Sequence, residues 1–482
     1  MLLNNSVWKN TCEIRKRKGL NKNITADAVV IGGGMAGILI AERLSSEGKR
    51  AVVLEAKQIA GGQTQNTTAK ITAQHGMIYS NLISQLKEKG AEEYAKANMR
   101  AVEWYRTTVE SRNIDCSFEN KDAYVYSECE SRLRNEYNAC KRLNLPVEYI
   151  TNPQIPYESK GAVQMKFQAQ FNPLPFIKEL SENLEIYENT PVITVKDNTV
   201  FCHEANVEAT DIIFACHYPF INFPGLYFAR MYQQRSYVLA LKNTPYIEGM
   251  YICAEENGFS FRMAGELLLL GGGQHRAGEN IYGGKYDILY DAAQKMFPKS
   301  SVVARWSAQD CITADGIPYI GRYSQSKPHW YVATGFGKWG MTTSCVAAEI
   351  ITDLIMGRKN SAEEIFSPAR CSLCSAKGTV NEVLHSAKGL IKQVVHIPNN
   401  KLEDISVGSG GSVFYQGKRV GIYRESADKY YAVSLRCPHL GCRLEWNQDE
   451  KSWDCPCHGS RFDYKGRLID NPAQNDLKVF EI

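Results

Sequence analysis

The chain has 482 residues, of which 44% are hydrophobic and 22% charged, and its formal net charge is +4. This length predicts about two to four globular domains, and the small net charge argues against a dedicated nucleic-acid-binding protein, which would carry a concentrated basic surface. No apolar run reaches the about 18 residues of a membrane-spanning helix and no secretory signal is visible, so we expect a cytoplasmic protein whose cysteines mostly stay reduced.

Residues 1–26 precede the first predicted strand and form an N-terminal extension. Its basic run, residues 13–23, is interpreted as a solvated tail rather than as a nucleic-acid-binding arm. Next, "DAVVI" predicts a buried parallel strand, Met35 to Glu47 a helix that Gly48 terminates, and "RAVVLE" a second strand. Together these elements predict a βαβ unit.

Three glycines lie between the first strand and the helix in the pattern G-x-G-x-x-G. Gly32 permits a tight turn, Gly34 lets the backbone approach a pyrophosphate, and Gly37 lets helix and strand pack closely. The phosphates would meet the free N–H groups at the start of the helix. Glu55 ends the second strand, at the spacing of a ribose-binding acid. The pattern predicts a dinucleotide site and leaves FAD and NAD open.

The middle of the chain predicts strands and one long helix. "VFCHEANVEATDIIFACHY" indicates strand, turn and strand, and "FSFRMAGELLLLGGGQHRAG" indicates two antiparallel strands and a loop. The segment from "GIPYIG" through "TGFGKWGMTTSCVAAEIITDLIMGR" predicts a strand, a glycine-rich turn and a helix.

Two segments favour FAD over NAD: "GGQTQNTTAK", soon after Glu55, and "DGIPYIG" with "TGFGKWGMT" much later. With them, residues 27–365 resemble the D-amino-acid-oxidase-like superfamily of FAD-dependent oxidoreductases, which implies an FAD-binding domain with an inserted substrate-binding subdomain. The flavin contacts predicted from the motif and the resemblance are Gly32, Gly34, Met35, Ala36, Gly37, Glu55, Ala56, Gly62, Thr64, Thr68, Asp315, Gly316, Gly335, Gly337, Lys338, Gly340, Met341 and Thr342.

Some members of this superfamily hold the flavin covalently through a histidine shortly after the ribose acid. The comparable position here is Asn66, so we expect non-covalent FAD. His75 and Cys311 lie near predicted flavin contacts and are the alternatives for a covalent link, but we interpret both as packing residues.

The resemblance also implies a substrate class, because the superfamily mostly oxidises C–N bonds of amines and amino acids. Tyr237, Arg262, His275 and Arg276 are the candidate substrate contacts, and an arginine among them would hold a carboxylate by a two-pronged hydrogen bond. Sheet packing or surface ion pairs explain each of them equally well. No catalytic base is assigned, since hydride removal from an amine needs only orientation and a deprotonated nitrogen.

Residues 366–395 are less apolar and predict a linker. Its Cys371 and Cys374 form an isolated C-x-x-C pair without recognisable partners, and we interpret them as linker cysteines. From residue 396 to 482 short strands and turns, including "SVFYQGKRVGIYRESADKYYAVSL", predict a small all-β domain.

This last domain carries four cysteines and two histidines in two short stretches, "CPHLGC" and "CPCHGS". Zinc usually takes C-x2–4-C pairs. The Cys-x-His pair, Cys437 and His439, and the Cys-x-x-His pair, Cys455 and His458, instead fit a Rieske [2Fe–2S] centre, in which two thiolates hold one iron and two imidazoles the other. The spacing makes zinc the lesser alternative.

The domain resembles the Rieske ferredoxin-like family, including "HLGC", "CPCHGS" and the closing "NPAQNDLKVFEI". This resemblance implies that Cys442 and Cys457 form a disulfide between the two cluster loops and that Ser460 donates a hydrogen bond to sulfur. Phe462 stands where Rieske proteins of respiratory cytochrome complexes have a hydrogen-bonding tyrosine. Losing that donor predicts a lower reduction potential than in those relatives.

The sequence therefore predicts an α/β Rossmann-type FAD domain with an inserted antiparallel-sheet substrate domain (α+β), followed by a small all-β Rieske domain. The whole arrangement, including "SVWKNT" and "TTAKITAQHG", resembles a bacterial family of FAD-dependent oxidoreductases with a C-terminal Rieske domain. Because a flavin accepts two electrons at once and an iron–sulfur cluster passes one at a time, their fusion suggests a relay from a small-molecule substrate through FAD and the cluster to an external acceptor. The alternative is an electron-transfer protein or redox sensor without its own substrate. Substrate identity, direction of electron flow and oligomeric state stay open.

Overall fold

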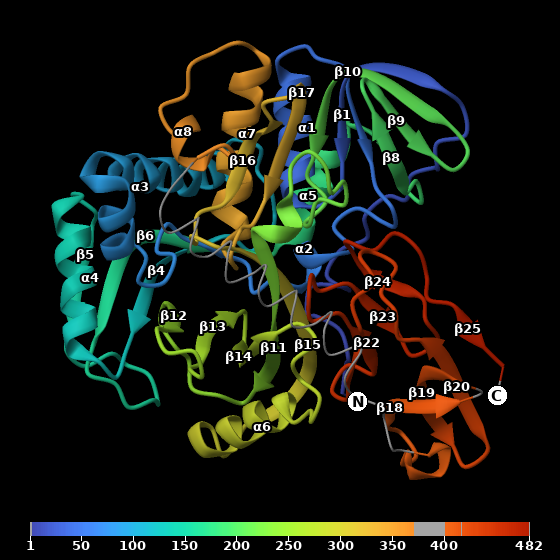
Figure 1. The fold of residues 1–482 in the computed structure, drawn as a ribbon. Helices are drawn as coiled ribbons and strands as arrows, with labels where there is room; N and C mark the ends of the chain where they lie inside the picture. Colours follow the sequence, from blue (N-terminus) through green and yellow to red (C-terminus); the bar gives the residue numbers. More distant parts are fainter. Residues whose placement is uncertain (1, 371–400, 416, 482) are drawn as a thin grey trace.

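The structure is a computed structural model that describes residues 2–370, 401–415 and 417–481. Cys371 and Cys374 therefore lie outside the described residues. Figure 1 shows a large α/β part formed by the first 370 residues and a small β part at the C-terminus, which lies beside β15 at one side of it.

The first sheet carries the nucleotide-binding motif. Its main path runs β16-β17-β10-β1-β2-β7, and the hairpin of β8 and β9 extends from β10. Because β1 pairs in parallel with both β2 and β10, the carboxyl ends of these three strands meet at one edge. The strands are β1 (Ile24–Ile31), β2 (Ala51–Leu54), β7 (Glu185–Tyr187), β8 (Val192–Lys196), β9 (Thr199–Cys202), β10 (Asn206–Phe214), β16 (Tyr319–Ser324) and β17 (Lys327–Thr334).

Helices cover this sheet because their apolar faces match its buried strands. β2 is buried along its whole length, as the unbroken run of apolar residues predicts for a central parallel strand. Helix α1 packs against α5 and α7, and α3 packs against α7. The helices are α1 (Met35–Ser46), α2 (Gln63–Asn66), α3 (Tyr79–Ser111), α4 (Glu130–Arg142), α5 (Pro173–Ser181), α6 (Lys285–Met296), α7 (Gly340–Ile355) and α8 (Glu363–Phe366), with a 3-10 turn η1 (Tyr227–Ala229).

The second sheet is the inserted one. Its order is β15-β11-β14-β13-β12-β4-β6-β3, with β5 beside β6, and its pairs are antiparallel except β4 with β12. The antiparallel pair predicted around residues 259–278 is present as β13 and β14. The strands are β3 (Lys70–Ile71), β4 (Glu119–Tyr126), β5 (Val147–Ile150), β6 (Ala162–Gln170), β11 (Met231–Lys242), β12 (Met250–Cys253), β13 (Ser260–Ala264), β14 (Leu267–Arg276) and β15 (Ser301–Thr313).

The C-terminal part is all-β, as predicted. It contains two antiparallel four-stranded sheets, ordered β18-β19-β20-β25 and β21-β22-β23-β24. Their strands are β18 (Gly410–Tyr415), β19 (Lys418–Ser426), β20 (Lys429–Ser434), β21 (Glu445–Asn447), β22 (Ser452–Asp454), β23 (Arg461–Asp463), β24 (Leu468–Asp470) and β25 (Val479–Phe480), preceded by the 3-10 turn η2 (Leu402–Asp404).

The N-terminal extension packs on the flavin part instead of forming a free tail. Trp8 is 5% exposed and donates its indole N–H to the carbonyl of Thr67 at 2.7 Å. Leu3 forms an isolated bridge with Ala304 of β15, and Leu20 is buried. Burial of Trp8 and Leu20 anchors the extension, while most of the basic run, residues 13–23, is exposed, as predicted for a solvated segment.

None of the helices within residues 2–370, 401–415 and 417–481 combines the length and the apolar character needed to span a membrane.

Candidate functional site

The glycine-rich turn joins β1 to α1 with the geometry that the motif predicts. Gly32 has a φ of +110°, and a Cβ on Gly37 would lie 1.8 Å from the carbonyl oxygen of Gly32. Gly34 caps α1 without a side-chain hydrogen bond, while the N–H of Met35 donates to the hydroxyl of Thr64 at 2.9 Å. The open helix N-terminus is therefore available to an anionic group such as a pyrophosphate.

Glu55 lies beside this turn at the end of β2. Its carboxylate accepts the backbone N–H groups of Gly33 and Lys57, both at 2.8 Å. Burial raises the pKa of Glu55, and the two N–H groups oppose that effect by stabilising the charged form. Its position fits the ribose-binding role that the sequence predicts.

A cavity of about 900 Å³ runs from this turn to the inserted sheet. This volume lies in the range of about 300–1,000 Å³ typical of ligand sites. The predicted flavin contacts that line it are Gly32, Gly34, Met35, Ala36, Glu55, Ala56, Gly62, Thr64, Gly335, Lys338, Gly340 and Met341. The walls thus come from both ends of the flavin part, as an elongated dinucleotide requires.

Other predicted flavin contacts lie behind this wall. Gly37 packs under the turn, and the Thr342 hydroxyl binds the carbonyl of Thr72 and the ring of His75. Asp315 forms a buried ion pair with Arg370 at 2.8 Å. Thr68, Gly316 and Gly337 also lie outside the lining. His75 is buried and stacked on Trp339, whereas Cys311 does line the cavity.

The sequence reasoning missed part of the wall. The segment that follows β10, from Ala215 to His217, and the segment from Thr190 to Val192 both line the cavity. Ligands in open α/β sheets bind at the carboxyl ends of parallel strands, so the end of "DIIFACHY" carried a usable signal.

The four candidate substrate contacts all lie outside the cavity lining. Arg262 is buried and donates to the carbonyls of Ala69 and Phe171, and burial lowers its pKa to about 9. Tyr237 stacks on His275, with 3.1 Å between the hydroxyl and Nε2. Arg276 lies over the ring of Tyr232 and donates to the carbonyl of Pro456 in the C-terminal part. These contacts give each side chain a structural role.

In the C-terminal part, two loops of matching construction carry the cysteine–histidine pattern. The carbonyl of Cys437 accepts the N–H of Gly441, and that of Cys455 accepts the N–H of Gly459, both at 2.9 Å. The two glycines have φ values of +82° and +78°, so each loop needs a residue without a Cβ at its turn. Cys442 and Cys457 form a disulfide that joins the two loops.

The four predicted ligands meet between these loops. The sulfurs of Cys437 and Cys455 are both buried, and the rings of His439 and His458 lie 4.9 Å apart at 90°. Nδ1 of both histidines is buried without a hydrogen-bond partner within the described chain, and so is Nε2 of His458. Such orphaned nitrogens fit metal ligation, since buried polar atoms otherwise find partners. Burial lowers the pKa of His439 to about 4 and that of His458 to about 3, which keeps both neutral as ligation requires.

The residues around the ligands fit the expected surroundings of a cluster. The buried Ser460 hydroxyl bonds to the sulfur of Cys437 and accepts the N–H of Ala473 at 3.0 Å. Phe462 is 0% exposed and pairs with Trp453 across β22 and β23. The position next to the ligand loop is thus apolar and offers no donor.

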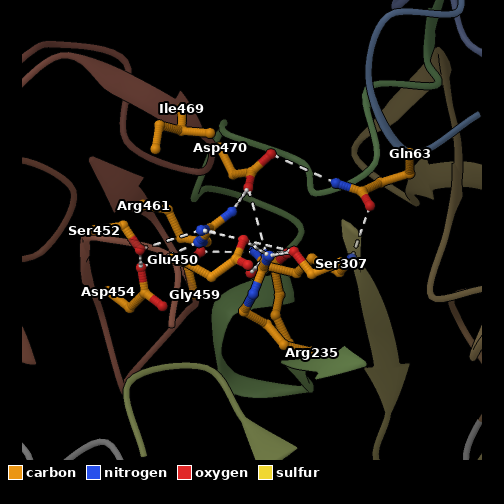
Figure 2. A network of polar contacts seen from close by, with 12 residues as sticks. Gln63, Arg235, Ser307, Glu450, Ser452, Asp454, Gly459, Arg461, Ile469 and Asp470 are labelled. Atoms are coloured by element: carbon orange, nitrogen blue, oxygen red, sulfur yellow. Dashed lines mark hydrogen bonds and ion pairs between the residues drawn. The ribbon is translucent and has the colours of Figure 1, made fainter. Parts of the chain in front are cut away.

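A buried ionic network joins the two parts of the chain (Figure 2). Arg235 of β11 is 2% exposed and lies 2.7 Å from the carboxylate of Glu450. Arg461 binds Asp454 at 3.1 Å, Asp470 at 3.0 Å and Glu450 at 3.3 Å. Burial alone would raise the pKa of all three carboxyls, but the two guanidinium groups hold these pKa values below their ordinary range. The network stays ionised and fixes how the parts meet.

Hydrogen bonds also connect β11 and β15 of the inserted sheet to a cluster loop, and the cavity wall to the segment after β24. Gln233 donates to the carbonyl of His458 at 2.8 Å, and Gln309 donates to that of Gly459 at 2.8 Å. Asn471 donates to the carbonyl of Cys216, a cavity residue, at 2.9 Å. His439 Nε2 lies 2.8 Å from Oδ1 of Asn222, so the histidine end of the site faces the flavin part.

The fold and the two sites define a flavoprotein fused to an iron–sulfur domain. Residues 27–354 match the FAD dependent oxidoreductase family, and residues 396–481 match the Rieske [2Fe-2S] domain. The chain belongs to the FAD dependent oxidoreductase family and carries a C-terminal Rieske domain. The first domain binds FAD and the second binds a [2Fe–2S] cluster. The predicted fold and both predicted cofactors are therefore confirmed.

Relatives share the whole arrangement or one part of it. A Bacillus subtilis (strain 168) protein with the name Rieske 2Fe-2S iron-sulfur protein YhfW is 37% identical over 99% of this chain and 97% of its own length. The cytochrome b6-f complex iron-sulfur subunit of Desmonostoc sp. (strain PCC 7906) is 40% identical over 12% of this chain and 32% of its own.

Solved structures show the fold of the flavin part. Glycine oxidase from Geobacillus kaustophilus aligns with a TM-score of 0.61 and 17% identity over 72% of this chain and 99% of its own. L-proline dehydrogenase from P. horikoshii aligns with a TM-score of 0.60 and 17% identity over 72% of this chain and 97% of its own.

Proposed function

We propose that this protein oxidises an amine, an amino acid or a related small molecule at FAD, and passes the electrons one at a time through the Rieske cluster to an external acceptor. FAD supplies a two-electron acceptor when bound, and a [2Fe–2S] cluster carries single electrons. The protein would work in the cytoplasm with non-covalent FAD. The substrate class is also supported by the fold neighbours, which include glycine oxidase and L-proline dehydrogenase.

One observation carries the relay. Gln233 donates to the backbone of the ligand residue His458 at 2.8 Å, and its side-chain oxygen lies 3.2 Å from Nε2 of His217, which lines the cavity. Gln233 and Gln309 are at most 1% exposed, and their side chains bond to each other at 2.6 Å. A connection of buried, directly bonded side chains of this kind would couple the cavity to the cluster loop over a short path.

The chain's own groups have separate roles in this proposal. The open N-terminus of α1 holds the pyrophosphate and Glu55 the ribose. Cys437, His439, Cys455 and His458 hold the cluster, while the disulfide between Cys442 and Cys457 braces the loops. The cavity-facing groups on β15 and on the loop before α7 position the substrate.

Anaerobic mixing with a panel of amines, N-methyl amino acids and hydroxy acids tests the proposal. A substrate should bleach the flavin absorbance, and the electron paramagnetic resonance signal of a reduced Rieske cluster should follow. Gln233→Leu should slow the second step and leave the first unchanged, whereas Gln154→Leu, the same change at an exposed position, should alter neither. A bleached flavin beside a cluster that stays oxidised would contradict the relay.

A further inference from the structure

Asp310 lies on the edge strand β15, between the flavin cavity and the Rieske domain. It follows Gln309, whose side chain reaches the carbonyl of Gly459 in the Rieske domain. Successive residues of a strand point to opposite faces. Asp310 accordingly turns away from the bound loop, and it lines the flavin cavity together with Lys338 and His217.

The carboxylate of Asp310 has no hydrogen bond or ion pair among the residues that the structure describes. Burial raises its pKa, against the opposing effect of Lys338, His217 and Arg235. Asp310 is half-buried at the cavity wall, and a carboxylate in such a place is costly to keep charged unless a cation or a donor pairs with it. The described part of the chain gives this carboxylate no partner, and the missing partner points to a ligand.

The charged groups around Asp310 are occupied, with one exception. Arg235 is paired with Glu450, and the Nε2 atom of His217 is held by Gln233 while burial lowers the pKa of that imidazole. Lys338 lies on the loop before α7, and its ammonium contacts the side-chain oxygen of Gln274. Burial lowers the pKa of Lys338, and Asp310 counteracts this effect. Among the charged groups next to Asp310, the cavity therefore presents one unpaired carboxylate, Asp310 itself, and one ammonium group without a carboxylate partner within ion-pair distance, Lys338.

We propose that Asp310 binds the ammonium group of an amine or amino acid substrate and accepts the proton that this group loses before oxidation. This inference rests on the proposed function, since it names the substrate class of the same cavity. Lys338 then faces the carboxylate of a zwitterionic substrate.

The proton and electron balance is simple. The N–H bond of the substrate ammonium breaks and an O–H bond forms on Asp310, which leaves a neutral amine. Oxidation of this neutral amine to an iminium ion would then break the neighbouring C–H bond with loss of a hydride, and FAD, when bound, would supply the two-electron acceptor. A carboxyl group whose charged form is disfavoured by burial is a better proton acceptor than an ordinary aspartate.

Benzamidinium and benzoate test this subsite in the oxidised holoprotein. They have the same ring and opposite charges, and benzamidinium has no C–H bond next to nitrogen that could be oxidised. An amidinium pairs with a carboxylate by two hydrogen bonds. Binding is followed by calorimetry and by the shift of the flavin absorbance.

We expect Asp310→Asn to weaken benzamidinium binding by about tenfold or more and to leave benzoate binding equal or tighter. Asp310→Glu, which keeps the carboxylate, should stay within a few-fold of the natural protein. Asp291→Asn on the exposed face of α6 is the matched control and should change neither affinity. FAD content and melting temperature confirm that the variants fold.

A benzamidinium affinity of Asp310→Asn within twofold of the natural protein would overturn the proposal. So would a natural protein that binds benzoate but not benzamidinium at any soluble concentration, or that binds neither. Because equilibrium binding involves no electron transfer, the outcome is independent of the relay. A cluster that stays oxidised would remove the relay and leave this subsite standing.

Discussion

Replacing Arg235 with methionine removes the guanidinium that joins β11 to the Rieske domain and keeps most of its volume. Arg235 is 2% exposed and lies 2.7 Å from Glu450 and 3.2 Å from Gln309. Breaking a buried ion pair from one side costs about 3–5 kcal/mol. Glu450 would keep Arg461 at 3.3 Å and the Ser307 hydroxyl at 2.6 Å, so we place the cost below this range, at about 2–3 kcal/mol. This corresponds to about a 30- to 150-fold weaker docking of the domain.

Two backbone amides report on this docking. The N–H groups of Gly284 and Lys285, at the start of α6, donate to the Asp449 carboxylate of the Rieske domain at 3.2 and 3.0 Å. The first N–H groups of a helix have no partner within the helix, so their protection depends on the docked domain. Hydrogen exchange at these two amides should accelerate by about 30- to 150-fold in Arg235→Met.

The matched control is Arg134→Met on α4, an exposed arginine paired with Glu130 four residues earlier. Such a surface pair contributes about 0.3–0.5 kcal/mol, so exchange at Gly284 and Lys285 should not change. Exchange in Arg235→Met that stays within threefold of this control would refute the reasoning, because the network would then not hold the domain.

Two further predictions concern the cluster and the pH dependence. Phe462→Tyr should raise the midpoint potential of the cluster by about 40 mV in voltammetry. The reason is that a hydrogen bond to sulfur that strengthens on reduction by roughly 1 kcal/mol favours the reduced form. An unchanged or lower potential would contradict the role given to this position. Arg461 and Arg235 lower the pKa of Asp454 and Asp470 in the folded protein even though burial acts the other way. The stability from these two carboxyls is therefore fully present above their unfolded pKa of about 4 and lost as the pH falls through their folded values. The protection of the Gly284 and Lys285 amides against exchange, corrected for the intrinsic effect of pH, should therefore be the same at neutral pH and at pH 5. A marked loss of protection at pH 5 would show that other groups control the docking.

The sequence predicts both cofactor sites well because their signals are local. The turn at Gly32 and the cluster loops at Cys437 and Cys455 depend on residues a few positions apart, where spacing determines geometry. Glu55 is similar, since a single βαβ unit places it next to the turn.

The interface and the substrate site depend on distant segments and could not be predicted in this way. Arg235 and Glu450 are 215 residues apart. Nothing in the sequence shows that these two residues meet. From the sequence alone, an arginine near a flavin site is interpreted as a substrate contact as readily as an interface residue. Arg262 was predicted as a substrate contact, but its guanidinium binds backbone carbonyls. Asp310 could not be predicted as a cavity residue from the sequence. Strand alternation assigns it to the cavity face of β15 only when Gln309, its neighbour, is known to contact the Rieske domain on the opposite face.

The most direct test of the relay is photoreduction of the flavin in the holoprotein under anaerobic conditions, followed by time-resolved absorbance and freeze-quench electron paramagnetic resonance. The docked arrangement predicts that the Rieske signal grows as the flavin is reoxidised, with a rate that does not depend on protein concentration. A rate proportional to protein concentration, or a cluster that stays oxidised beside a reduced flavin, would contradict electron transfer within one chain.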